Sequence, residues 1–173
     1  MSEALPSQID IRKLAVKGAK FDAKFPVSRL NRLSGQLADD VGSVAVRLEL
    51  SIDEQGLRRL VGDVFAEVHV ACQRCLQVMS LEIHSTLDLA IVWSDEEARH
   101  LPKHIDPLIV GEELTDLEDV VEEELILSLP IVSYHNRDVC RVTGPLSFGD
   151  EIVEEGEPKE NPFKVLEQLK SDK

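Results

Sequence analysis

The sequence predicts an α+β fold in which an antiparallel β-meander is covered by one acidic helix. Between positions 44 and 93, long segments alternate apolar and polar residues, which is the period of half-buried strands. A stripe of apolar residues at helical spacing follows within 115–129. The chain of 173 residues is 43% hydrophobic, which is enough for one packed core. The sheet could curl towards a barrel, and short helices are expected near both termini.

The N-terminal residues are expected to form short helices and one short strand. Asp10 can cap a helix over 11–17. The alternation of residues 21–27 beside a proline predicts an edge strand. Ser28 could then cap a helix that runs through Leu37.

Three long strands are predicted next. Residues 44–52 alternate strictly, and the segment 53–56 is typical of a turn. The second strand spans 57–72, with the side chains of Val64 and its even-numbered neighbours on one face. A turn at 72–75 leads into a third strand that ends near Trp93. Consecutive strands of this length favour an antiparallel meander, and a further strand is expected at 106–110.

The following helix is expected to begin at a capping box of Thr115 and Glu118 and to end before Pro130. Its first turns are crowded with carboxylates, which the helix dipole favours. This acidic surface could simply be solvated or could bind a basic partner. The candidates for partner contacts are Asp119, Glu122 and Glu123.

Composition predicts where the domain ends. Residues 1–145 are expected to form one domain, because residues 130–160 contain few periodic apolar residues. Residues 146–160 are acidic and rich in glycine and proline, which predicts a flexible linker. Residues 161–173 predict a short C-terminal helix that starts at an Asn-Pro pair.

The net charge of −14 is distributed unevenly. The first 60 residues hold 10 Lys and Arg against 8 Asp and Glu, whereas the remainder hold 9 against 25. The acidic part would repel a phosphate backbone, so direct RNA contact should use arginines outside it or at the hairpin turn. The candidates are Arg29, Arg32, Arg58, Arg59 and Arg74.

Several classes of protein are disfavoured. No apolar stretch reaches the length of a membrane helix, and the N-terminus does not resemble a signal peptide, so a cytoplasmic location is expected. Three cysteines, an odd number, argue against a disulfide framework. The common phosphate-binding, hydrolase and metalloprotease motifs are absent, and no small-molecule substrate is evident. We therefore do not expect an enzyme.

One group of residues has a spacing that suits metal binding. Cys72 and Cys75 are two residues apart in the hairpin turn, and His135 precedes Cys140 by five positions. Together they could form a closed structural Cys3His zinc site. The alternative is three reduced cysteines and an ordinary loop histidine. A thioredoxin-like redox role is disfavoured, because the Cys pair lies between two strands.

Taken in order, these motifs resemble the YceD family, the large ribosomal RNA subunit accumulation proteins. The resemblance rests on the turn Cys72-Gln73-Arg74-Cys75-Leu76, the helix end Glu122–Pro130, the pair His135 and Cys140, and residues 161–166. It implies a role in the synthesis, processing or stability of 23S rRNA and in large-subunit biogenesis, without an established catalytic activity. Some relatives carry a second Cys pair where this chain has His135 and Cys140, which supports a four-ligand site.

The implied partner is 23S rRNA or a pre-ribosomal particle. Because the protein is acidic, a second possibility is a chaperone-like binding module for a basic ribosomal protein. A third is an RNA-processing enzyme, for which the sequence offers no general acid–base pair.

Overall fold

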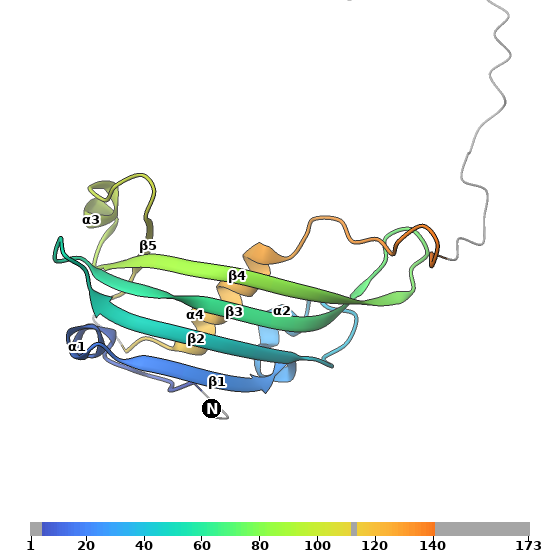
Figure 1. The fold of residues 1–173 in the computed structure, drawn as a ribbon, viewed down its shortest axis with the longest axis horizontal. Helices are drawn as coiled ribbons and strands as arrows, with labels where there is room; N and C mark the ends of the chain where they lie inside the picture. Colours follow the sequence, from blue (N-terminus) through green and yellow to red (C-terminus); the bar gives the residue numbers. More distant parts are fainter. Residues whose placement is uncertain (1–4, 112–113, 141–173) are drawn as a thin grey trace, which may run out of the picture. The chain divides into compact units, whose positions relative to one another are not determined.

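A computed structural model describes residues 5–111 and 114–140, all within one compact unit, Met1–Val142 (Figure 1). The strands are β1 (Lys20–Pro26), β2 (Ser43–Ile52), β3 (Arg58–Ala71), β4 (Val78–Val92) and β5 (Asp106–Ile109). The helices are α1 (Ile11–Lys17), the 3-10 helix η1 (Val27–Arg29), α2 (Asn31–Ser34), α3 (Asp95–Arg99) and α4 (Leu117–Ser128).

The strands form a single sheet in the order β1-β2-β3-β4-β5. The first four strands pair antiparallel in sequence order, so the predicted meander is confirmed. The barrel is wrong, because β1 and β5 are the two edges of the sheet and are not paired with each other. The α+β class is therefore correct, with an open sheet.

Strand β5 differs from the other strands because it runs parallel to β4. The connection between them, residues 93–105, contains α3. A parallel neighbour needs a crossover of about a dozen residues, and this connection supplies it. The sheet is consequently mixed, and only the last four residues of β4, 89–92, pair with β5.

The turn between β2 and β3 is stabilised by Asp53. Its Oδ1 accepts hydrogen bonds from the backbone N–H groups of Gln55 and Leu57, both at 2.9 Å. Gly56 adopts φ +82°, a conformation that costs glycine little. This local chemistry sets the register that pairs Val46 with Val64.

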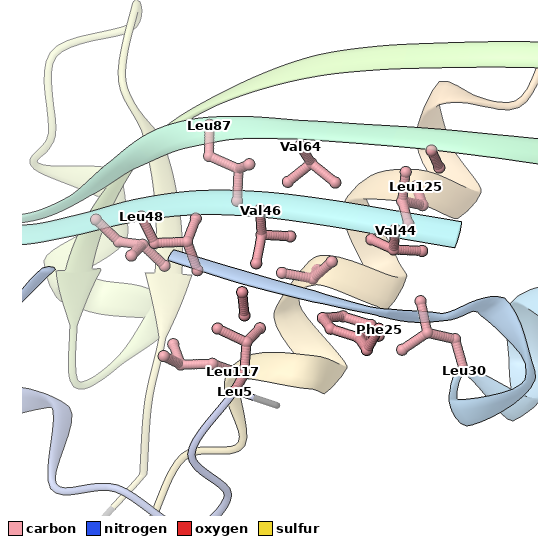
Figure 2. Close-up of a cluster of buried hydrophobic side chains, with 14 of the residues drawn as sticks. Leu5, Phe25, Leu30, Val44, Val46, Leu48, Val64, Leu87, Leu117 and Leu125 are labelled. Atoms are coloured by element: carbon pink, nitrogen blue, oxygen red, sulfur yellow. The ribbon is translucent and has the colours of Figure 1, made fainter. Parts of the chain in front are cut away.

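The core lies between one face of the sheet and the helices (Figure 2). The alternation predicted from sequence is confirmed along β2 and β3, where every second side chain from Val44 to Leu50 and from Val64 to Val70 is buried. From α4, the side chains of Leu117, Val121 and Leu125 complete this layer. Figure 1 shows α4 crossing behind the strands.

Two local predictions need correction. The cap of α4 is Asp116, whose Oδ1 accepts from the Glu118 N–H at 2.9 Å, because Thr115 is engaged in a β-bridge with Ile9. The helix expected to start at Ser28 is divided into η1 and α2, since Leu30 between them has non-helical dihedrals. The predicted linker and C-terminal helix, 146–173, lie outside the described residues. Within the described part, no helix has the length and hydrophobicity needed to span a membrane.

Candidate metal centre

The β3–β4 turn places Cys72 and Cys75 side by side. Cys72 follows the end of β3 and is fully buried. Its N–H donates to the Gln77 carbonyl at 2.9 Å, and its carbonyl accepts from the Leu76 N–H at 2.8 Å. Leu76 has φ +59°, a left-handed conformation that lets the chain reverse immediately after Cys75. The turn is therefore a tight knuckle with two sulfur atoms.

The segment after α4 brings the other two candidate ligands to this knuckle. Figure 1 shows residues 129–140, in orange, running from the end of α4 towards the β3–β4 turn. The Gln73 N–H donates to the Ser133 carbonyl at 2.9 Å, and its side-chain amide donates to the Ile131 carbonyl at 3.3 Å. The Arg74 guanidinium donates to the His135 carbonyl at 3.3 Å. These three hydrogen bonds place the two segments side by side.

The four side chains converge on one point. The donor atoms of Cys72, Cys75, His135 and Cys140 all lie within 4.8 Å of one another. Two sulfurs, those of Cys72 and Cys140, are 3.8 Å apart, and the Cys75 Sγ is 3.3 Å from the His135 Nδ1. A tetrahedral zinc site with Zn–S bonds of about 2.3 Å has sulfur–sulfur edges of about 3.8 Å. The residues therefore fit a zinc ion in number, chemistry and spacing.

Hydrogen bonds prepare one of the sulfurs for metal ligation. Burial disfavours the thiolate of Cys72, but the backbone N–H groups of Cys75, His135 and Arg74 donate to it and lower its pKa to about 5. The His135 N–H lies 3.4 Å from this sulfur. Burial and its thiol neighbours raise the pKa of Cys140 to about 11. A cation at the centre would displace the thiol protons, since metals bind the thiolate form.

Such a site is closed. Four protein ligands fill a tetrahedral shell and leave no position for a substrate or a catalytic water. The centre could join the hairpin to the segment after α4. We call residues 72–78 and 131–140 together the clasp end.

The structure brings two predicted groups of residues together. The Arg29 guanidinium donates to the Glu118 carboxylate, and that of Arg32 donates to Glu123, each at 2.5 Å. The Glu123 hydrogen bond raises the pKa of Arg32. Two of the arginines proposed for RNA contact thus pair with the acidic helix proposed for partner contact.

Glu122, another of the predicted partner contacts, lies inside the fold. Only 5% of its surface is exposed, and its Oε1 accepts from the backbone N–H groups of Arg32 and Leu33 at 2.7 and 3.1 Å. Glu122 thus supplies the hydrogen-bond acceptor for the backbone N–H groups at the start of α2, which lacks a side-chain cap of its own. Asp119 remains exposed.

The other three arginines occupy different settings. Arg58 lies over the Trp93 ring at 5.7 Å, with Arg12 over the same ring at 4.9 Å. Arg59 pairs with Asp53 and Asp88. Arg74 lies 5.2 Å from the ring centre of Tyr134, at the clasp end. RNA contact by each of these arginines stays a prediction.

The apolar character of the clasp end was not predicted from the sequence. Its side chains Leu76, Ile131, Tyr134 and Val139 are all more than half exposed. They are spread over a turn and a loop, so no periodicity reveals them. Only the hydrogen bonds that hold the loop beside the turn bring them near one another.

The fold and the site define a small α+β protein with a Cys3His cluster that could hold a structural metal ion. The sequence model of the family described as "Large ribosomal RNA subunit accumulation protein YceD" matches residues 60–170. A relative from Haemophilus influenzae with the same description is 30% identical over 168 residues, 96% of each chain. The chain therefore belongs to the YceD family. No solved structure matches it.

Proposed function

We propose that this protein supports the accumulation of 23S rRNA, and hence large-subunit biogenesis, as a non-catalytic factor in the cytoplasm. The observation that carries the proposal is the match to the YceD family, including a relative aligned over nearly the whole chain. A non-catalytic role is supported by the four-ligand geometry of the candidate metal centre, which offers no open position.

The test is deletion of the gene followed by measurement of 23S and 16S rRNA and of subunit profiles. The expected result is a fall in 23S relative to 16S rRNA, with restoration by the intact gene. An unchanged 23S to 16S ratio under slow and fast growth would contradict the proposal. A purified protein that cleaves or modifies 23S precursors would contradict the non-catalytic part.

We also propose that Cys72, Cys75, His135 and Cys140 hold one structural zinc ion. The support is the 3.8 Å sulfur–sulfur distance between Cys72 and Cys140 and the donor set of three thiolates and one imidazole, which favours zinc over oxygen-seeking cations. When bound, zinc would supply a cross-link between the β3–β4 turn and the segment after α4.

Elemental analysis of protein purified without added metal tests this site. We expect about one zinc per chain, and a large loss in the Cys140→Ser variant. Ser80→Ala, a substitution of an exposed hydroxyl on β4, is the control and should retain the metal. A zinc content near zero in the unmodified protein would rule out the site.

A second candidate function is a chaperone-like module that shields a basic ribosomal protein. The observation that favours it is the net charge of −14. Asp119 and Glu123 remain the surface candidates for that contact, with Glu123 shared with Arg32. Titration of purified basic ribosomal proteins should show binding that weakens with salt, and no binding at low salt would exclude this alternative.

A further inference from the structure

We propose that the clasp end is the surface through which this protein contacts RNA, and that it takes unpaired nucleotides. This inference rests on the proposed function and assigns its RNA contact to residues 72–78 and 131–140. Bases would stack on Tyr134 and the apolar side chains around it, while Arg74 and Arg137 face phosphate groups.

The clasp end carries less negative charge than the rest of the described residues taken together. It contains two arginines and one carboxylate, that of Asp138. The other described residues hold 12 Lys and Arg against 21 Asp and Glu. A zinc ion with three thiolates and a neutral imidazole would add a formal charge of −1, which leaves the clasp end neutral. RNA therefore meets less repulsion here than at the acidic helix α4, whose residues include five carboxylates and no Lys or Arg.

The exposed side chains have the chemistry of a base-stacking platform. Tyr134 is 52% exposed, and Arg74 lies 5.2 Å from its ring centre, an arginine–aromatic pair of the kind on which bases stack. Arg137 is exposed and, among the described residues, makes no ion pair. Its charge is free for a phosphate, unlike that of Arg32, which Glu123 neutralises.

Stabilisation of the fold does not explain why two exposed positions of the clasp end are occupied by apolar residues. Leu76 has φ +59° and is 78% exposed, although glycine or asparagine would adopt this conformation at lower cost. Ile131 is 94% exposed and buries almost nothing. Leu76 lies in the turn and Ile131 in the loop that Gln73 binds beside it, so both are candidates for one contact surface. Together with the arginine–aromatic pair, they suit unstacked bases, whose faces are apolar.

Two RNA probes, one single-stranded and one duplex, distinguish base stacking on the clasp end from general electrostatic attraction. The zinc-loaded full chain is titrated with a fluorescent single-stranded RNA of about 12 nucleotides, within the usual site size. The same strand in a duplex is the second probe. Tighter binding of the single strand is expected, because duplex bases cannot stack on the protein. Equal or tighter duplex binding, or no binding, would overturn the inference.

Variants locate the contact. Tyr134→Ala should weaken single-strand binding about tenfold, whereas Tyr134→Phe should keep it. Phe65→Ala is the matched control, since Phe65 is 50% exposed but lies on the sheet. Arg137→Gln should reduce the slope of log affinity against log salt by about 0.7, and Arg99→Gln, also exposed, should not. Equal effects of target and control variants would overturn the assignment.

A photo-crosslinking amino acid in place of Ile131 tests the contact in cells. An RNA adduct is expected, and a protein adduct alone would overturn the proposal. The Tyr134→Ala variant is also expressed in the deletion strain. If it restores the 23S to 16S ratio as well as the unmodified protein does, the clasp end is not needed for the function, whereas the proposed function itself still stands. Zinc content and thermal unfolding verify that each variant is folded.

Discussion

The sheet layer and the clasp end are stabilised by different physical means. Between the sheet and α4, leucine and valine side chains such as Leu48, Val64 and Leu125 are fully buried. At the clasp end, Cys72 is the fully buried side chain, and Ile131 and Leu76 point into solvent. Hydrophobic burial can stabilise the first region alone. The second is joined by a few hydrogen bonds, and the proposed zinc ion would add a cross-link between its two segments.

Removal of the metal should separate the two regions most clearly. After chelation, we expect amide exchange in residues 131–140 to accelerate by orders of magnitude, because the cross-link to the turn is lost. The paired strands β2 and β3 should retain their protection, since their buried layer does not include the ligands. Hydrogen-exchange mass spectrometry measures both in one experiment. Equal loss of protection in both regions would show that the clasp end is part of one cooperative core.

Truncation of the core should give the next largest effect. Leu125→Ala removes a fully buried side chain from α4 and should lower the free energy of unfolding by about 2–5 kcal/mol. Leu127→Ala, on the exposed side of the same helix, should change it by less than about 0.5 kcal/mol. Urea denaturation of the two variants compares them directly. Similar losses would contradict the placement of α4.

Glu122 should matter more than its neighbour Glu123. Glu122→Ala leaves the N–H groups of Arg32 and Leu33 without their acceptor and should cost about 1–3 kcal/mol. Glu123→Ala breaks only an exposed ion pair with Arg32, so its effect should be the smaller of the two. Denaturation curves at low salt test this ranking. A reversed order would place Glu122 on the surface.

The smallest effect concerns a partly exposed pair between His69 on β3 and Asp39 in the connection before β2. The His69 side chain, 3.0 Å from the Asp39 carboxylate, lowers the pKa of Asp39 below its ordinary value of 3.8. The contribution of a carboxyl with a depressed pKa is present above its unfolded-state pKa and is lost as the pH falls through the folded-state pKa. NMR titration should show this pKa moving up in His69→Gln, and an unchanged value would exclude His69 as the cause.

Local patterns predicted the elements well where one interaction dominates. Alternation determines which side chains of β2 and β3 are buried, because strand residues point to opposite faces. The start of α4 was harder to place, because both Thr115 and Asp116 can cap a helix. In the structure, the backbone of Thr115 forms a β-bridge with Ile9, and Asp116 caps the helix.

Charge patterns were less informative about surfaces. The sequence makes Arg29 and Arg32 candidates for RNA contact and Glu123 a candidate for partner contact, but it does not show that Arg29 pairs with Glu118 and Arg32 with Glu123. Sequence separation of about ninety residues hides such pairs, since no local rule relates α2 to α4. The same limit hid the burial of Glu122.

By itself, the sequence determined the α+β class, the meander, the acidic helix and the four candidate ligands, because these follow from periodicity, turn chemistry and the spacing of cysteines. Only the tertiary structure decided that the sheet is open, that β5 is parallel, and that His135 and Cys140 reach the knuckle of Cys72 and Cys75. The physical reason is that edges, crossovers and ligand clusters depend on contacts between distant segments, whereas periodicity records only which face of an element is apolar.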